Sequence, residues 1–228
     1  MNILQAQNIV RSFKLGSGEK LDVLKDITVS VPENTLAILK GPSGSGKTTL
    51  MNIMGGLDAP NSGTMIFDGK DIYSRAATDI DELRRRDFGF VFQSVSLIPI
   101  MTVYENVEFS LRLSGFKGDR AERVMKCLSL VGLDARSDHM PQELSGGEQQ
   151  RVAIARAIAH SPRIIFADEP TAELDSQTAI HVVSLFKELV EKEHVTIVMT
   201  THDVGLMSAG DIVYSIENGE ISGCETQN

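Results

Sequence analysis

One eight-residue segment limits the possible folds of this chain more than any other. Residues 41–48 read Gly-Pro-Ser-Gly-Ser-Gly-Lys-Thr and fit the spacing G-x-x-x-x-G-K-[ST]. An apolar run, Leu36 to Leu39, precedes the segment, and apolar residues from Leu50 to Leu57 follow it at helical spacing. A strand, a glycine-rich turn and a helix in this order predict a loop that binds phosphate groups. A flexible glycine turn before an ordinary helix is the plainer alternative, and the matched spacing and flanks disfavour it.

The residue types in this loop suit a nucleoside triphosphate. Glycines allow the backbone to curl so that successive N–H groups point at the β- and γ-phosphate oxygens, beside a positive helix N-terminus. The Lys47 ammonium adds a full charge on the same oxygens, where it also serves catalysis, and the Thr48 hydroxyl can ligate Mg²⁺. The sequence therefore predicts that ATP and Mg²⁺ bind here, with the nucleotide held by Gly41, Pro42, Ser43, Gly44, Ser45, Gly46, Lys47, Thr48 and Thr49.

A second pattern places two acids at the end of an apolar run. Ile164 to Ala167 reads as a buried strand, and Asp168 and Glu169 follow it directly. Two carboxylates are costly there unless a cation lies beside them, and a phosphate-bound Mg²⁺ meets that need. We expect Asp168 to hold the metal, directly or through water, and Glu169 to polarise the attacking water as the catalytic carboxylate. The alternative is that both acids only cap the turn at Pro170.

The rest of the sequence reads as an α/β protein. Strands are expected at Ile3 to Lys14, Val23 to Val31, Leu36 to Lys40, Thr64 to Phe67, Gly89 to Phe92, Arg163 to Ala167, Val195 to Thr200, Ile212 to Ile216 and Glu220 to Ser222. Turns are expected at Gly16-Ser17-Gly18, Pro32-Glu33-Asn34, Asp68-Gly69 and Asn218-Gly219. Helical spacing covers Val103 to Leu113, Ala121 to Val131, Gln149 to His160 and Thr178 to Lys192. These segments predict an antiparallel β layer, then an α/β core that is interrupted by a helical insertion.

Composition narrows the class of partner. The 228 residues carry a formal net charge of −9 and a sequence pI near 5.1, which argues against a nucleic-acid-binding surface. The one basic run, Arg84 to Arg86, is typical of a solvated helix face. No basic region followed by an apolar stretch opens the chain, and no window is apolar enough to cross a bilayer. We therefore expect a soluble, cytoplasmic protein with reduced cysteines, in which Cys127 lies buried on a helical stripe.

A third motif, Leu144-Ser145-Gly146-Gly147-Glu148-Gln149-Gln150, stands before a further helix. It offers a hydroxyl, bare backbone N–H groups and a positive helix N-terminus, although alone it could be an ordinary helix cap. With this signature segment, residues 144–150, the chain resembles the ATP-binding domains of ABC transporters over nearly its whole length. The resemblance implies one ATPase domain, residues 1–228, of P-loop NTPase fold. Residues 1–93 and 161–228 would form a RecA-like core with the antiparallel β subdomain, and residues 94–160 the helical subdomain.

The resemblance also assigns single residues. Beyond the phosphate loop, contacts to ATP are implied for Phe13, Ser145, Gly146, Gly147 and Asp175. Gln93 would touch Mg²⁺ and the attacking water, and His202 would contact the γ-phosphate, so both join the catalytic set. Phe13 would stack on adenine, and Asp175 would lie in the loop that crosses a dimer interface. Taken alone, a surface glutamine, a structural histidine and a core phenylalanine are the plainer explanations.

The resemblance implies two partners. One chain holds one phosphate loop and one signature segment, so a head-to-tail dimer with two composite ATP sites is expected, a homodimer in the simplest case. The subunit would hydrolyse ATP for a separate membrane permease and lie at the inner face of the cell membrane, held only through that permease. The expected contact is the groove beside Gln93, bordered by Ser94 to Met101 and Val103 to Leu113. Leu97 to Met101 suits a partner's helix, while a buried connector remains the open alternative.

Three short segments narrow the resemblance further. Phe88 to Gln93, Leu97-Ile98-Pro99 and Gly55 to Asp58 are similar to the bacterial subgroup that serves macrolide export, lipoprotein release and antimicrobial-peptide resistance with FtsX-type permeases. Export or extraction of a peptide, drug or lipoprotein is the resulting expectation. The open alternative is a regulatory module that controls cell-wall hydrolases, as in the relative FtsE. Members that act on DNA or ribosomes are disfavoured, because the chain has no coiled-coil or zinc-cysteine insertion and only one cassette.

Overall fold

Two β-sheets and a layer of helices make up the computed structural model, which describes residues 1–16, 18–74 and 76–227. The smaller sheet has the strand order β2-β1-β4-β5, and the larger one β10-β9-β3-β8-β7-β6. The strands are β1 Asn2–Lys14, β2 Lys20–Pro32, β3 Leu36–Lys40, β4 Ser62–Phe67, β5 Lys70–Asp71, β6 Phe88–Val91, β7 Ile164–Ala167, β8 Thr196–Thr201, β9 Ile212–Glu217 and β10 Glu220–Thr226. The helices are α1 Lys47–Met54, α2 Ala77–Arg86, α3 Val103–Ser114, α4 Arg120–Leu130, α5 Gly146–Ile158 and α6 Ser176–Glu193, with 3₁₀ turns at Asp134–Arg136, Pro141–Glu143 and Val204–Ala209.

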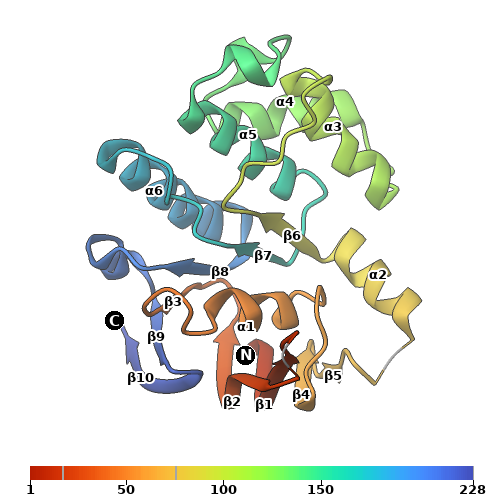
Figure 1. The fold of residues 1–228 in the computed structure, drawn as a ribbon. Coiled ribbons are helices and arrows are strands. Elements are labelled where there is room, and N and C mark those ends of the chain that lie inside the picture. The colour runs from red at the N-terminus through yellow and green to blue at the C-terminus, as the bar shows by residue number, and fades with distance from the viewer. Residues whose placement is uncertain (17, 75, 228) are drawn as a thin grey trace.

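The smaller sheet is the predicted antiparallel layer. Strand β1 pairs antiparallel with both β2 and β4, and the hairpin from β4 to β5 turns at Asp68 and Gly69 as expected. Of the predicted turn Gly16-Ser17-Gly18, Ser17 lies outside the described residues. In Figure 1 this sheet lies at the bottom, with α1 between it and the larger sheet. The buried faces of β1, β2, β4, α1 and one side of β3 form one continuous hydrophobic core.

The larger sheet carries the parallel strands of the α/β core. Strand β3 runs parallel to β8 and β9, and β7 runs parallel to β6 and β8. Both faces of this sheet are covered, which explains the continuous apolar runs of its strands. Leu36 and Ile38 of β3 pack with the helices above, while Ala37 and Leu39 pack with α1 and the smaller sheet below. The predicted fold class, α/β with an antiparallel layer and a helical insertion, is confirmed.

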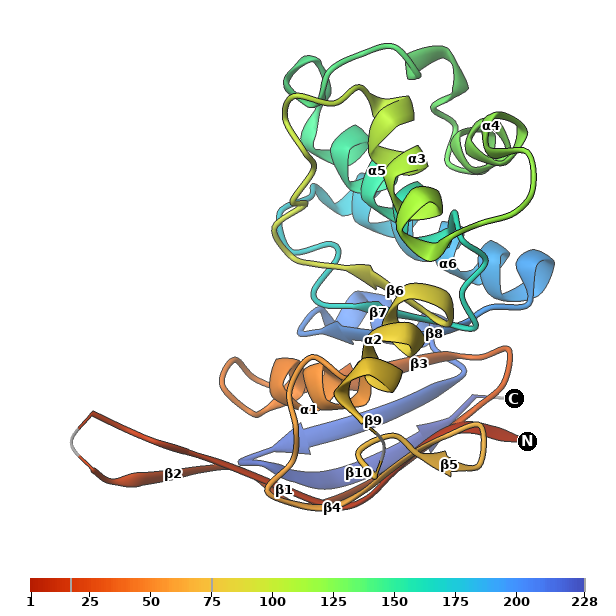
Figure 2. The same cartoon turned by 90° about the vertical axis from the view of Figure 1, so that its right-hand side faces the viewer.

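Helices α3, α4 and α5 lie together at the far end of the molecule from the smaller sheet (Figure 2). All three fall within the predicted insertion, residues 94–160. Cys127 of α4 is fully buried among their apolar side chains, as its helical spacing predicted. Burial raises the pKa of its thiol to about 11, so this cysteine acts as a small apolar core residue rather than a reactive thiolate. Among the described residues, no helix combines the length and apolar character needed to cross a bilayer.

Two helices differ from the expectation. Helix α5 begins at Gly146 and ends at Ile158, whereas the apolar spacing placed it at Gln149 to His160. The earlier start follows from the Ser145 cap, which brings the two glycines of the signature segment into the first helical turn. The apolar spacing did not predict the extent of helix α2, because Ile80 and Leu83 are its only large apolar residues and give no clear stripe; only its basic run was interpreted as a helix face. Its final turn carries the basic run Arg84 to Arg86.

His160, shortly after α5, is a partly buried titratable group at the junction of the helical layer and the larger sheet. Its Nε2 lies 3.0 Å from the Phe88 carbonyl oxygen, and its Nδ1 is buried without a partner among the described residues. Burial lowers the pKa of His160 below its usual value near 6.5. The folded state therefore holds a neutral imidazole where the unfolded chain would already begin to protonate.

We predict that His160 makes the protein more sensitive to acid. Because the folded pKa lies below the unfolded one, this group lowers the free energy of unfolding as pH falls through and below about 6.5. A His160→Gln variant, which can still donate to the Phe88 carbonyl, should lose less thermal stability between about pH 7.5 and about pH 5.5. Melting temperatures of both proteins across this range test it. Parallel losses in the two proteins would contradict the prediction.

Candidate functional site

The predicted phosphate loop connects the carboxyl end of β3 to the first turn of α1. Gly46 caps α1 with a φ of 106°, a left-handed conformation that favours glycine. A Cβ at this position would also lie 2.7 Å from Leu24 Cδ2 and 3.0 Å from the Val23 carbonyl oxygen. Glycine is therefore needed at position 46 both for the backbone conformation and for the close approach of β2. This geometry leaves the free N–H groups at the start of α1 beside the loop.

Lys47 lies at the centre of this loop. Its side chain is only 4% exposed, and its ammonium donates to the carbonyl oxygens of Gly41 at 2.9 Å and Pro42 at 3.1 Å. The Glu169 carboxylate lies 3.6 Å away. The nearby Ser45 hydroxyl is buried and has no partner among the described residues. A buried cation held by neutral carbonyls and an unused hydroxyl fit a loop that accepts phosphate oxygens.

Asp168 follows β7 and joins two hydroxyl groups from other segments. Its Oδ1 accepts a hydrogen bond from Thr48 Oγ1 at 3.1 Å and another from Thr200 Oγ1 at 2.6 Å. Mg²⁺ binds through few protein oxygens, with water and substrate phosphates completing its shell, and the Thr48 and Asp168 oxygens match that pattern. No group of three or more His, Cys, Asp or Glu side chains within the described part of the chain could hold a metal by itself. A metal here would therefore depend on the substrate's own oxygens.

Glu169 and His202 meet at the same edge of the sheet. Glu169 Oε2 lies 3.0 Å from His202 Nδ1, and its other oxygen faces Lys47. The backbone of Glu169 is left-handed, with a φ of 42°, which is uncommon for a residue with a side chain. Its N–H donates to Thr200 Oγ1 at 2.8 Å, which helps to hold that conformation. The structure thus brings together Lys47, Thr48, Asp168, Glu169 and His202, as the sequence predicted.

Thr200 is a site residue that the sequence analysis missed. Its hydroxyl donates to Asp168 and accepts from the Glu169 N–H, so it fixes both predicted acidic residues. The side chain is fully buried at the end of β8. The available signal was a polar residue at the end of the apolar run Val195 to Thr200, immediately before the loop to His202.

Gln93 follows a strand that is bonded to this cluster, but among the described residues it makes no hydrogen bond to the cluster itself. Strand β6 ends at Val91, whose carbonyl oxygen accepts a hydrogen bond from the Asp168 N–H at 2.8 Å. Gln93 follows two residues later, exposed, and no described hydrogen bond joins its amide to Thr48, Asp168 or Glu169. Its assignment to the metal and to the attacking water stays a prediction.

Phe13 is exposed at 37%, which rules out the plainer explanation of a core residue. It lies near the outer end of β1, opposite Leu21 of β2, and the Arg11 guanidinium covers one ring face at 4.5 Å from the centroid. Exposure of a ring is needed for stacking on a base. Phe13 therefore remains a candidate for adenine contact, without a contact in this structure that decides it.

The signature segment and Asp175 lie elsewhere in the chain. Ser145 is exposed, and a Cβ added at Gly146 would meet nothing within 4 Å. Among the described residues, no hydrogen bond or ion pair joins residues 144–150 to the phosphate loop. Asp175 caps α6 by accepting from the N–H groups of Gln177 and Thr178, and it also accepts from the Thr178 hydroxyl at 2.6 Å. Asp175 therefore has a structural role as the cap of α6. Among the described residues it makes no hydrogen bond to the Lys47 cluster, although its neighbours Leu174 and Ser176 line a small pocket together with Glu169 and His202.

Comparison with known proteins assigns the family. Residues 24–172, more than half of the chain, match the family described as ABC transporter. The chain belongs to the ABC transporter family. The lipoprotein-releasing system ATP-binding protein LolD of Syntrophotalea carbinolica is 40% identical over 97% of each chain. The macrolide export ATP-binding/permease protein MacB of Syntrophobacter fumaroxidans is 42% identical over 97% of this chain and 31% of its own length.

Solved structures agree with this assignment. A dimeric structure of MJ0796, a bacterial ABC transporter cassette by its description, matches with a TM-score of 0.90 and 37% identity over 99% of both chains. A second structure of that cassette, from Methanocaldococcus jannaschii, is a dimeric post-hydrolysis state bound to ADP and Pi, with a TM-score of 0.90 and 36% identity. The chain is an ATP-binding subunit of an ABC transporter and an ATP hydrolase.

We predict that Thr200 positions the two acids of this ABC ATPase for turnover. A Thr200→Val variant keeps the side-chain shape and removes the donor to Asp168 and the acceptor for Glu169. ATP hydrolysis should fall by about tenfold to hundredfold, the usual cost of losing a group that orients a ligand or catalytic residue, while ATP binding is retained. Steady-state hydrolysis at saturating ATP and Mg²⁺ measures the loss.

Thr196→Val is the matched control for this experiment. Thr196 is also buried on β8, but at its other end, where its hydroxyl accepts from the Asn34 N–H at 3.0 Å. This variant should lose a comparable hydrogen bond and keep the wild-type hydrolysis rate. Equal rates in Thr200→Val and Thr196→Val would show that Thr200 does not position the acids.

Proposed function

We propose that two copies of this chain close head-to-tail around two ATP molecules and that this closure drives a membrane permease. The observation that carries the proposal is the separation within one chain. Lys47, Thr48, Asp168 and Glu169 form one cluster, whereas Ser145 and Gly146 are exposed, with open space at Gly146. Each chain thus offers two different halves of a phosphate site, the Lys47 cluster and the signature segment, and the two do not meet within one chain. The two structures of the similar MJ0796 cassette are described as dimeric, which supports a second copy of the chain.

The residues of the cluster have distinct roles in this proposal. When ATP binds, the Lys47 ammonium exchanges its hydrogen bonds to the Gly41 and Pro42 carbonyl oxygens for contacts with the negatively charged phosphate oxygens. Thr48 and Asp168 supply oxygen ligands for Mg²⁺, which neutralises phosphate charge when bound. Glu169 accepts a proton from the attacking water, and His202 holds Glu169 in place and contacts the γ-phosphate. Gln93 orients the water, Phe13 stacks on adenine, and Asp175 lies at the interface.

We predict that Glu169→Gln separates binding from hydrolysis. Glutamine keeps the shape of the side chain but cannot take the proton, so hydrolysis should fall by about 10²-fold to 10⁴-fold. With ATP and Mg²⁺, the particle mass in sedimentation should rise from one 24.9 kDa chain to twice that value. Without nucleotide it should return to the monomer.

Two further variants check the origin of this dimer. Glu173→Gln removes the same charge from an exposed residue four positions later. This variant should hydrolyse ATP at the wild-type rate and should show the same particle mass as the wild-type protein. Adding Lys47→Ala to Glu169→Gln should abolish the dimer by weakening ATP binding. A Glu169→Gln protein that binds ATP and stays monomeric at high concentration would contradict the proposed closure.

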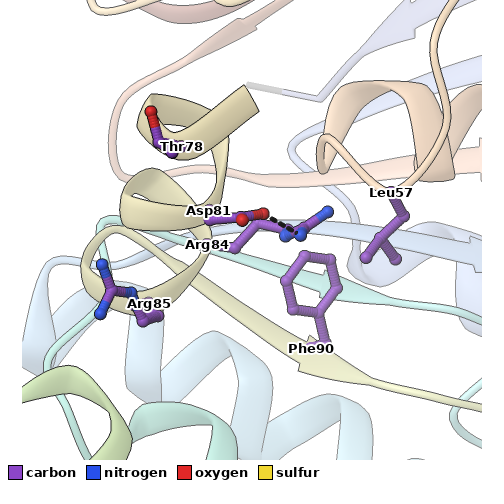
Figure 3. A pocket seen from close by; sticks show the side chains of 6 residues that line it. All are labelled: Leu57, Thr78, Asp81, Arg84, Arg85 and Phe90. Carbon is purple, nitrogen blue, oxygen red and sulfur yellow. Dashed lines mark hydrogen bonds and ion pairs between the residues drawn. The ribbon is translucent and has the colours of Figure 1, made fainter. Parts of the chain in front are cut away.

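The proposed permease contact is a groove between the larger sheet and the helical layer. Two adjoining hollows of about 570 and 430 Å³ share Arg84, Arg85 and Phe90. Figure 3 shows the Phe90 ring facing Leu57, with the Arg84–Asp81 pair beside the ring and Arg85 pointing away from it. Apolar side chains line the second hollow, namely Phe88, Phe90, Phe92, Ile98, Phe109 and Leu113. An apolar floor of this size suits the side chains of a short partner helix.

The loop beside this groove is partly a connector and partly exposed. Buried Asn106 fixes it by accepting from the Ile98 N–H and by donating to the carbonyl oxygens of Ile98 and Met101. Leu97 packs against the helical core, while Ile100 is 81% exposed. Leu97 therefore fits the alternative of a buried connector, whereas the exposed Ile100 is available for the proposed partner contact.

An FtsX-type permease is the partner that we propose, with export or extraction of a peptide, drug or lipoprotein as the work done. The similarity to LolD and MacB supports this choice, because their names state lipoprotein release and macrolide export. The subunit would lie at the cytoplasmic face of the membrane, held through this permease alone.

We predict that Leu113→Asp weakens permease binding. Leu113 lines the groove and is 55% exposed, so aspartate can be accommodated in the free subunit but places a charge against the apolar partner. Co-purification of the tagged subunit with its co-expressed FtsX-type permease should fall by at least about tenfold. Met125→Asp on α4, 39% exposed and outside the groove, is the control and should co-purify normally. Equal recovery of the permease with both variants would exclude the groove as its binding site.

A further inference from the structure

The Ser145 hydroxyl, which the proposed function needs at the partner's ATP, already has an acceptor within its own chain. Ser145 Oγ donates to Glu148 Oε2 at 2.8 Å, and the Ser145 N–H donates to the same oxygen at 2.9 Å. In return, the Glu148 N–H donates to Ser145 Oγ at 3.3 Å. A serine hydroxyl has one proton, so it cannot donate to Glu148 and to a phosphate oxygen at once.

Glu148 also places a negative charge next to the position expected for the γ-phosphate. The two hydrogen bonds from Ser145 hold the pKa of Glu148 below its usual range, so the carboxylate is ionised at neutral pH. Arg136 lies 3.5 Å from the other carboxylate oxygen, but its side chain is 48% exposed and screens the charge only in part. An approaching phosphate therefore meets a competing acceptor of its own sign.

The helix around this pair is held in place. The Gly147 Cα packs so closely against α6 that an added Cβ would lie 2.6 Å from Thr178 Cγ2. That contact restrains the start of α5, so rotation about its own side-chain bonds is the simplest way for the Ser145 hydroxyl to change its acceptor. Rotation of one hydroxyl away from Glu148 is then the local change that a phosphate oxygen must bring about.

We propose that Glu148 is a positioning residue that keeps Ser145 from donating until ATP is abundant, and so raises the ATP concentration at which two cassettes close. This inference rests on the proposed head-to-tail dimer. Arg136 acts in the opposite sense, because its guanidinium offsets the Glu148 charge. The pair Glu148 and Arg136 together sets the ATP concentration needed for closure.

The experiment measures ATP-dependent dimerisation by sedimentation in the Glu169→Gln protein, with and without Glu148→Gln. Glutamine still accepts from the Ser145 N–H and completes the same cap, so the helix start is preserved. Removing the charge should lower the half-maximal ATP concentration by about fivefold to tenfold. Arg136→Gln should raise it. Increasing sodium chloride from about 0.05 M to about 0.5 M should narrow the difference between the Glu148 and Glu148→Gln proteins.

Glu105→Gln is the matched control, because Glu105 completes an equivalent cap with Thr102 at the start of α3. It should leave the half-maximal ATP concentration unchanged. If Glu148→Gln leaves it unchanged as well, or raises it, the inference is wrong while the dimer stands. If the Glu169→Gln protein does not dimerise at any ATP concentration, the proposed function fails and this inference fails with it.

Discussion

The Asp168 carboxylate is the contact on which the nucleotide edge of this protein depends. It accepts from Thr48 at the start of α1 and from Thr200 at the end of β8, while its own backbone N–H bonds to Val91 of β6. Three elements that are far apart in the sequence are thereby joined at one residue, two of them through its carboxylate. Because the parallel strands end at the same edge of the sheet, the loops that follow them deliver their functional side chains to this point. Glu169 lies next to Asp168 in the chain and contacts both Lys47 and His202.

The second constraint is that this edge is incomplete within one chain. Hydrolysis is accelerated most when positive groups surround the transferred phosphoryl group. In the described structure, Lys47 and the N–H groups at the start of α1 lie on one side of the expected phosphate position. The matching hydroxyl and N–H groups of the signature segment face outward at the start of α5. In the proposed dimer, this separation would couple hydrolysis to association of two chains, because each chain would supply only one side of the phosphate site. ATP binding would then be converted into a change of distance between the two chains.

Residue patterns alone were enough to predict the sheets and most of the cluster, because strands, glycine turns and terminal acids have local signals. What they missed depends on register or on weak local signals. The pairing of Ala167 with Met199 places Asp168 beside Thr200, and no single segment contains that information. Helix α2 has too few apolar residues for a stripe, and the glycines at the start of α5 resemble a loop until the Ser145 cap is seen. The strained backbone of Glu169 likewise has no local signal.

Helix α5 connects the outward-facing signature segment to the groove beside β6. Ser145 caps its first turn, and near its last turn Arg156 donates to the carbonyl oxygens of Val95 and Ser96. The loop that Arg156 holds follows β6, the strand whose Val91 carbonyl accepts from the Asp168 N–H. In the proposed dimer, one end of α5 would lie at the partner's ATP and the other end at this loop, so the helix would move both together. Closure at the nucleotide would then displace the border of the groove where the permease is proposed to bind.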